Sequence, residues 1–300
     1  MLTIVGWLWK DPNCATQYTP EHANKWAPMI HRHLEMPHRF VLMTDYPDAE
    51  YHPLIQPIKL WDDWRELRNP KWSARKPHCY LRIKAFSKEV RDIFGDRFVS
   101  IDLDCVVQDR LDPLFDREED FVIFHRPNFN PNRERNKYQG SIWMMTTGSR
   151  AHVWENFHGA ESVEAASCFM GTDQAWFRYA LGPDEAGWTK DDGVLGWPDV
   201  YSDNRWLAKP PPGARIYFFY GEMKPEDMCN AREPCCKHCP PPLKIFAKFR
   251  IDGKRLVRDK LSCENCGRPL ELLRPWSITN DKIECDKSAR SHVWIEAMYG

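Results

Sequence analysis

The stretch FVSIDLDCVV, residues 98–107, places two carboxylates inside an apolar run that is rich in β-branched residues. Such a run predicts a buried strand of an α/β sheet. Side chains two positions apart on a strand share a face, so Asp102 and Asp104 would point the same way. Because buried, unpaired carboxylates are costly, we expect them at the carboxyl end of the strand, where open α/β sheets hold their ligands.

Other apolar segments follow one another in a strand–helix order. The expected strands are 2–9, 39–45, 55–60, 98–107, 121–125, 141–147 and 214–220. The expected helices are 20–34, 77–94, 150–158 and 172–181. The first has Thr19 as N-cap and Pro20 at its first helical position, and Gly95 stops the second. This alternation predicts an α/β fold with a mostly parallel sheet packed between helices.

The composition limits the class of protein. The chain has 300 residues, of which 42% are hydrophobic, so it can bury a sizeable core. A formal net charge of -1 argues against binding nucleic acid through bulk charge, although a local basic patch stays open. The first ten residues, MLTIVGWLWK, indicate a strand and not a signal peptide, and no window is long and apolar enough to span a bilayer. We therefore expect a cytoplasmic protein with reduced thiols.

The pattern breaks at PCCKHCPPPLK, residues 234–244, where prolines and cysteines gather. Seven of the 11 cysteines lie between Cys229 and Cys285. In a reducing compartment, clustered cysteines favour a metal site over disulfides. We expect one domain over residues 1–228 and a small metal-stabilised module over residues 229–300.

The two acids of the 98–107 strand are candidate metal ligands. Hard carboxylate oxygens suit Mg²⁺ or Mn²⁺, and such an ion could hold a substrate diphosphate. The alternative is a strand edge carrying two solvated acids, paired with a neighbouring arginine. A bare D-x-D tripeptide is common by chance, so the flanking segments decide between these interpretations.

Those flanking segments resemble a known family. FVSIDLDCVVQDRLDPLF, residues 98–115, is similar to the D-x-D region of GT-A nucleotide-sugar glycosyltransferases, in particular the glycogenin and bacterial lipopolysaccharide galactosyltransferase group. Five further segments resemble motifs of that family in the same order: TDYP (44–47), KPHCYLRIKAF (76–86), YQGSIWMMTTGS (138–149), GTDQAWF (171–177) and GARIYFFYGEMKP (213–225). The resemblance covers about three quarters of the chain, residues 1–228.

The resemblance implies a GT-A, Rossmann-like sheet and transfer of a sugar from a nucleotide-diphosphate donor, with UDP as the expected nucleotide. It implies roles for ten residues: Asp102 and Asp104 holding Mn²⁺ or Mg²⁺ on the donor diphosphate, Lys84 and Lys224 stabilising that diphosphate, Asp45 near the base or ribose, Gln139, Gly140 and Ser141 beside the sugar, and Asp173 and Gln174 facing the reacting carbon. For Asp173 the alternative is a helix cap shared with Thr172, and for Asp45 it is an acid in a turn.

One position departs from the family pattern. The late loop of the family usually supplies a histidine as third metal ligand, and here Tyr220 stands at that position, before Gly221. A phenol is a poor ligand for Mg²⁺ at neutral pH. The resemblance therefore leaves open whether water completes the site, whether metal binds more weakly or whether metal use differs.

The cysteine-rich tail predicts structural zinc. Cys263-x2-Cys266-Gly has the form of a zinc knuckle, which either Cys285 and His292 or the earlier pair Cys236-x2-Cys239 would complete. We favour the set Cys263, Cys266, Cys285 and His292. A second zinc would use residues from Cys229, Cys235, Cys236 and Cys239, with His238 near them; free thiols in a crowded loop are the alternative.

The leading hypothesis is a metal-dependent glycosyltransferase whose acceptor is a glycan, a small molecule, a protein or a modified nucleic-acid base. A second hypothesis is a zinc-ribbon nucleic-acid-binding protein on an inactive scaffold, since residues 244–260 are locally basic. A nucleotidyltransferase is a third, but WLWKDPNCATQ, residues 7–17, is not a glycine-rich phosphate loop. The sugar, the acceptor and the stereochemistry stay open.

Overall fold

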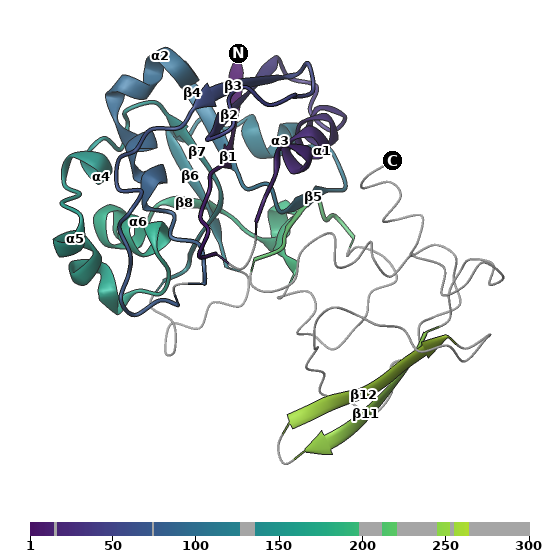
Figure 1. Ribbon diagram of the computed structural model, residues 1–300. Helices are drawn as coiled ribbons and strands as arrows, with labels where there is room; N and C mark the ends of the chain where they lie inside the picture. Colours follow the sequence, from purple (N-terminus) through teal and green to yellow (C-terminus); the bar gives the residue numbers. More distant parts are fainter. Residues whose placement is uncertain are drawn as a thin grey trace. The chain divides into compact units, whose positions relative to one another are not determined.

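The computed structural model describes residues 1–14, 17–73, 75–126, 136–197 and 212–220, and two later strands, Ile245–Asp252 and Arg255–Cys263 (Figure 1). The chain divides into two compact units. The first comprises Met1–Val200 and Pro212–Glu222, and the second comprises Tyr201–Pro211 and Met223–Gly300. Within the described residues, no helix is both long and apolar enough to cross a membrane.

The first unit is built on a seven-stranded sheet with the order β3-β2-β1-β4-β7-β6-β8. Its strands are β1 (Leu2–Leu8), β2 (His38–Thr44), β3 (Ile55–Lys59), β4 (Arg97–Ile101), β6 (Phe121–His125), β7 (Tyr138–Thr146) and β8 (Ala186–Trp188). Strands β3, β2, β1 and β4 pair in parallel, as do β6 and β8, whereas β7 runs antiparallel to both neighbours. The predicted α/β class with a mostly parallel sheet is confirmed.

A second, three-stranded sheet has the order β5-β10-β9, from β5 (Cys105–Val107), β10 (Ile216–Phe218) and β9 (Val194–Gly196). The α-helices are α1 (Pro20–His31), α2 (Arg91–Phe94), α3 (Asp112–Phe115), α4 (His152–Glu155), α5 (Ala160–Ala165) and α6 (Asp173–Leu181). The 3-10 helices are η1 (Tyr80–Phe86), η2 (Lys88–Val90), η3 (Ala166–Cys168) and η4 (Lys190–Asp192). In the second unit, β11 (Ile245–Asp252) and β12 (Arg255–Cys263) form an antiparallel ribbon.

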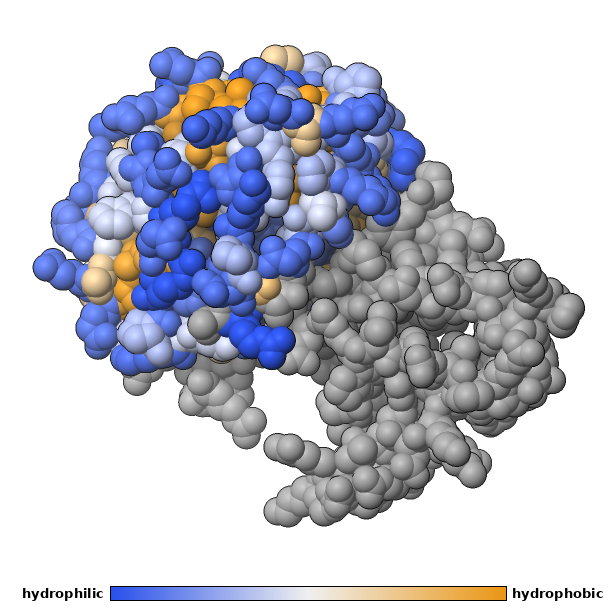
Figure 2. All heavy atoms as spheres, in the orientation of Figure 1, coloured by the Kyte–Doolittle hydropathy of each residue, from blue (hydrophilic) through white to orange (hydrophobic). Residues whose placement is uncertain are grey.

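Alternation along the central strands divides the core into two layers, one on each face of the large sheet. Ile4 of β1 belongs to the layer that includes α1 and α3 residues, and Val5 and Trp7 belong to the layer that includes residues of η1, α2, α4 and α6. Figure 1 shows these two groups of helices on opposite sides of the sheet. The described surface in Figure 2 is mainly hydrophilic, with apolar patches between polar side chains, as expected when both faces are covered.

Two sequence signals act as predicted. Helix α1 begins after Thr19, whose backbone N–H donates to His22 Nδ1 at 3.0 Å, and has Pro20 at its start. Gly95 ends α2 with a φ of 75°, a conformation that favours glycine. A third signal was unforeseen: a Cβ at Gly6 would lie 2.9 Å from the Trp26 ring, so this glycine lets α1 approach β1 closely.

The prediction of one helix over residues 77–94 is wrong. The segment forms η1, η2 and α2 in succession, with Ser87 in extended conformation between the first two. Six of the seven residues of η1 are buried, Arg82 among them. An α-helix would not place this set of side chains on one face, so tertiary packing outweighs the helical pattern here.

Candidate functional site

The two paired acids lie at a corner between the two sheets. Strand β4 ends at Ile101, Asp102 and Asp104 follow outside any strand, and β5 then pairs antiparallel with β10. The predicted single strand over residues 98–107 is therefore wrong, because its second half joins the other sheet. The expectation that the acids follow the carboxyl end of a strand is nevertheless met for β4.

Asp102 is bound by a backbone group of β7 and by a side chain of η1. Its backbone N–H donates to the carbonyl of Ser141 at 2.9 Å, and its Oδ1 accepts from Arg82 Nη1 at 2.6 Å. Arg82 also donates to Asp173 Oδ2, from Nε at 2.8 Å and from Nη2 at 2.6 Å. Arg82 thus joins two acids that are far apart in the sequence.

Arg82 was not among the predicted site residues, although it lies two positions before Lys84. It is 4% exposed, and its immediate neighbours Leu81 and Ile83 are also buried. An arginine inside an apolar run is a signal that sequence analysis could have used, because a buried charge needs a partner.

A bulge in β7 brings Gly140 and Ser141 to this corner. Trp143 pairs with Ile123, but the next pair joins Gln139 to Phe124. Residues 140–142 of β7 therefore have no partner in β6. The Gly140 carbonyl accepts from Arg82 Nη1 at 3.3 Å, and a Cβ at this position would lie 3.0 Å from Nη2. Bulges often lie beside functional sites, and here Gly140 leaves room for the guanidinium because it has no side chain.

The start of α6 closes the other side of the site. Asp173 Oδ1 accepts from the Gln174 backbone N–H at 2.9 Å and from the Thr172 hydroxyl at 3.3 Å. The Gln174 side-chain carbonyl accepts from the Gly140 backbone N–H at 3.2 Å. The Asp173 carboxylate therefore receives donors on both oxygens, which fixes its orientation.

Asp104 has different neighbours. Its Oδ2 accepts from the Tyr18 hydroxyl at 2.9 Å, and its backbone carbonyl accepts from the Phe219 N–H at 2.9 Å. Phe219 directly precedes Tyr220, which is partly buried and packs against the core. The segment that carries Tyr220 thus lies beside Asp104.

Burial dominates the electrostatics of the corner. Burial raises the pKa of Asp102, the Arg82 guanidinium lowers it, and the negative charges of Asp104 and Asp173 raise it further. Burial alone would lower the pKa of Arg82, but Asp173 and Asp102 raise it. Arg82 is thus a permanent positive charge beside the carboxylates of Asp102 and Asp173.

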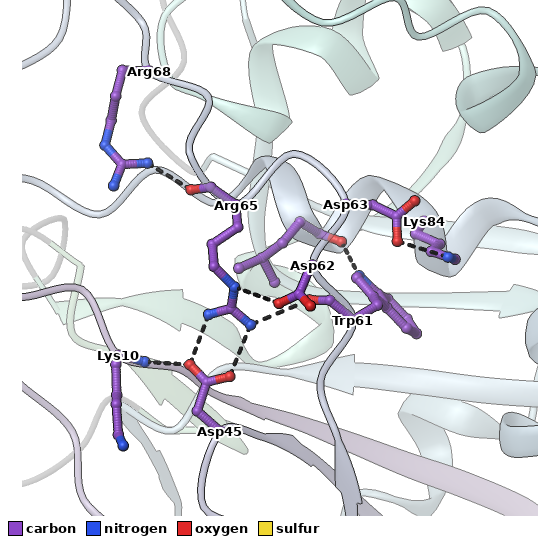
Figure 3. Close-up of polar contacts among 9 residues, drawn as sticks. Lys10, Asp45, Trp61, Asp62, Asp63, Arg65, Arg68 and Lys84 are labelled. Atoms are coloured by element: carbon purple, nitrogen blue, oxygen red, sulfur yellow. Dashed lines mark hydrogen bonds and ion pairs between the residues drawn. The ribbon is translucent and has the colours of Figure 1, made fainter.

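Asp45 and Lys84 pair elsewhere (Figure 3). Both Asp45 oxygens accept from Arg65, at 2.7 and 2.8 Å, and Oδ2 also accepts from the Lys10 backbone N–H at 2.8 Å. Lys84 Nζ lies 2.7 Å from Asp63 Oδ2. The structure thus brings together Asp102, Asp173, Gln174, Gly140 and Ser141, and it gives Asp45 and Lys84 other partners.

Of the remaining predicted site residues, the structure describes only Gln139 and Cys263. Gln139 is 6% exposed and lies next to the bulge in β7. Cys263 is the last residue of β12. The others lie outside the described residues: Lys224, Cys229, Cys235, Cys236, Cys239, Cys266, Cys285 and His292. Among the described residues, no three or more His, Cys, Asp or Glu side chains gather as a metal site.

No protein-family model matches the sequence, and no curated protein relative matches it. Solved structures to which the chain is similar include the galactosyltransferase LgtC in complex with donor and acceptor sugar analogues, at 12% identity and a TM-score of 0.48, covering 74% of this chain and 88% of that chain. An active-site mutant of LgtC matches at 12% identity and a TM-score of 0.49, covering 79% of this chain and 90% of that chain. The bifunctional glycosyltransferase WbbM in its apo form is a third, at 14% identity and a TM-score of 0.45, covering 75% of this chain and 46% of that chain.

Proposed function

We propose that this chain is a metal-dependent glycosyltransferase that moves a sugar from a nucleotide-diphosphate donor, with UDP as the expected nucleotide, to an acceptor hydroxyl. The observation that carries the proposal is the convergence of separate segments at one corner. Asp102 follows β4, Arg82 lies on η1, Asp173 starts α6 and Gly140 lies in the bulge of β7. A site at the carboxyl end of a central strand is where α/β sheets bind ligands.

The carboxylates of this corner fit Mn²⁺ or Mg²⁺. Asp102 and Asp104 offer hard oxygen ligands on two residues that follow one strand end. Mg²⁺ commonly binds through one or two carboxylates, waters and substrate phosphates, so Tyr220 need not act as a third ligand. When bound, such an ion would neutralise charge on the departing diphosphate.

The protein groups around the acids supply position and charge. Arg82 holds Asp102 and Asp173 in fixed orientations and adds a buried positive charge beside the proposed diphosphate site. Gln174 ties the start of α6 to Gly140. Preorganised groups of this kind stabilise charge that develops in a transition state, because they need no rearrangement during the reaction. Asp173 and Gln174 would then lie beside the reacting carbon.

The other parts of the proposal concern the rest of the chain. The proposed acceptor is a glycan, a small molecule or a modified nucleic-acid base, and the proposed setting is the cytoplasm. We further propose that residues 229–300 hold structural zinc through Cys263, Cys266, Cys285 and His292. Metal analysis of the purified chain, with and without Cys266→Ser, tests the zinc separately from the donor site.

The donor site is tested by calorimetric titration of a panel of nucleotide sugars with and without Mn²⁺. The proposal expects binding of at least one UDP-sugar that is strengthened by Mn²⁺ and lost in Asp102→Asn. Asp109→Asn is the matched control, since the Asp109 side chain is 56% exposed and lies five positions beyond Asp104. Absence of binding across the panel, or equal binding by Asp102→Asn, would refute the proposal.

A further inference from the structure

The connection between β3 and η1 contains a loop that is fastened at both ends to the start of α6. Asn69 Nδ2 donates to the Gly171 carbonyl at 3.3 Å, and the Cys79 backbone N–H donates to the Thr172 hydroxyl at 3.4 Å. Thr172 directly precedes Asp173, one of the acids of the candidate site. The loop between these anchor points therefore starts and ends beside that site.

The residues between the anchors are strongly basic. The segment PKWSARKP, residues 70–77, has three basic residues and no acidic one, and we call it the basic loop. Lys71, Arg75 and Lys76 are all exposed. Lys71 Nζ lies 3.5 Å from Glu164 Oε1, and both of these side chains are more than half exposed. Within the part of the chain that the structure describes, Arg75 and Lys76 have no carboxylate partner, so the loop presents positive charge that the fold does not neutralise.

Local hydrogen bonds shape the basic loop. The Lys71 backbone N–H donates to Asn69 Oδ1 at 2.9 Å, and the Trp72 N–H donates to the Asn69 carbonyl at 3.0 Å. The Lys76 N–H donates to the Ser73 carbonyl at 3.0 Å. A proline at each end of the loop restricts the backbone further. A ligand that binds to this loop therefore loses little free energy to ordering it.

Apolar side chains accompany the charges. Trp72 is partly buried, and Lys76 Nζ lies 4.6 Å from the centroid of its ring. Met170, which directly precedes Gly171, is 41% exposed. The apolar faces of sugar rings pack on such side chains, and carboxylates or phosphates pair with lysine and arginine. Charge and apolar surface together suit an acidic sugar.

We propose that the basic loop binds the acceptor, and that this acceptor is a glycan carrying carboxylate or phosphate groups. The inference rests on the proposed function, because it concerns the second substrate of the same site. A nucleic acid fits less well. Nucleic-acid-binding proteins commonly neutralise about 6–10 phosphates, whereas the loop offers three cations, one of which lies beside Glu164. A ligand with few negative charges matches this number.

Binding of the fluorescently labelled full chain to an array of carboxylated, phosphorylated and neutral glycans, with UDP and Mn²⁺ present, tests this inference. We expect the acidic glycans to be preferred, and the array shows whether carboxylate or phosphate is recognised. The triple variant Lys71→Gln/Arg75→Gln/Lys76→Gln should lower the affinity for these glycans about 10-fold, which corresponds to about 1.4 kcal/mol. Glu164→Gln should strengthen binding, because it removes the acid beside Lys71, and misfolding does not produce such a gain.

The matched control is Lys25→Gln/Lys88→Gln/Arg110→Gln, which removes the same charge from exposed residues that pair with glutamates elsewhere in the first unit. It should leave the preference for acidic glycans unchanged. The inference is overturned if no glycan binds, if neutral glycans bind as tightly as acidic ones, or if the triple variant and the matched control bind equally. It is also overturned if Glu164→Gln brings no gain, or if an oligonucleotide binds more tightly than every glycan.

This outcome is separable from that of the proposed function, because the array measures glycan binding and the calorimetric titration measures donor binding. Donor binding without a preference for acidic glycans would overturn this inference alone. A preference for acidic glycans without binding of any nucleotide sugar would refute sugar transfer and leave the basic loop as a glycan-binding site.

Discussion

Arg82 donates from two nitrogens, at 2.6 and 2.8 Å, to one oxygen of Asp173, and both side chains are almost completely buried. A buried pair of this kind is strongly destabilising to break, because the remaining charge is left without compensation. The same guanidinium reaches Asp102, so the stability of the first unit and the geometry of the candidate site depend on one residue.

Replacing Arg82 with glutamine should lower the free energy of unfolding by about 3–5 kcal/mol and, if the proposed function holds, lower turnover by about 10²-fold. Denaturant unfolding followed by fluorescence measures the first effect. Lys84→Gln is the control: this residue lies on the same 3-10 helix and pairs with the partly exposed Asp63, so its loss should cost less than about 1 kcal/mol. Equal losses of unfolding free energy in the two variants would contradict the conclusion that Arg82 is the buried charge on which the first unit depends.

Gly140→Ala should disturb the site through Arg82. The added Cβ would lie 3.0 Å from Arg82 Nη2, and such overpacking typically costs about 1–3 kcal/mol. We expect weaker donor binding along with reduced stability. Gly182→Ala is the comparison, because its cost comes from a φ of 77° with no atom near the new Cβ. If Gly182→Ala weakens donor binding as much as Gly140→Ala, steric pressure on Arg82 is not the cause.

Strands β1, β2, β3 and β6, helix α1 and the position of the acids after β4 could be predicted from sequence, because each depends on local signals. Thr19, Pro20 and Gly95 act on their own backbone, and the apolar run of β4 is contiguous. The break after Ile101 depends on the pairing of β5 with β10, more than 100 residues later, and no local pattern reports such a pairing.

The choice between Arg82 and Lys84 shows the same limit. Both basic residues lie within one segment, and in a 3-10 helix residues two positions apart point to different sides. Which side faces Asp102 depends on how the segment packs against β7 and α6. The resemblance directed attention to Lys84, whereas packing places Arg82 at the corner.

Asp45 offers a test of whether an acid serves the donor or the fold. Its carboxylate is held by Arg65 through two bonds, so Asp45→Asn and Arg65→Gln should have similar effects, with a coupling energy of about 0.5–3 kcal/mol in a double-mutant cycle. Unfolding measurements on the two single variants and the double variant give this value. A donor role independent of Arg65 would instead appear as a higher KM in Asp45→Asn alone.

His125 should make stability depend on pH. Burial lowers its pKa from 6.5 to about 4, so the unfolded chain binds the proton more readily between these values. Stability that is present above pH 6.5 is therefore lost as the pH falls toward 4. We expect a loss of about 1–2 kcal/mol, a value reduced by solvent screening because the ring is only partly buried. Unfolding midpoints between these pH values measure the loss.

His125→Phe keeps an aromatic ring to stack on Tyr138, whose ring centroid lies 5.5 Å away, and removes the titration. The variant should show a shallower decline in stability over the same pH range. His152→Phe, which changes an exposed histidine, should retain the decline of the parent chain. A decline that persists unchanged in His125→Phe would assign it to other groups.

The acid pair is tested most directly by the release of UDP from UDP-sugars, measured as Mn²⁺ is titrated into the parent chain and into Asp102→Asn, Asp104→Asn and Asp109→Asn. The account predicts Mn²⁺-dependent release by the parent chain and by Asp109→Asn, and a loss of at least about 10²-fold in the other two variants. Release that continues undiminished in Asp102→Asn and Asp104→Asn would contradict it.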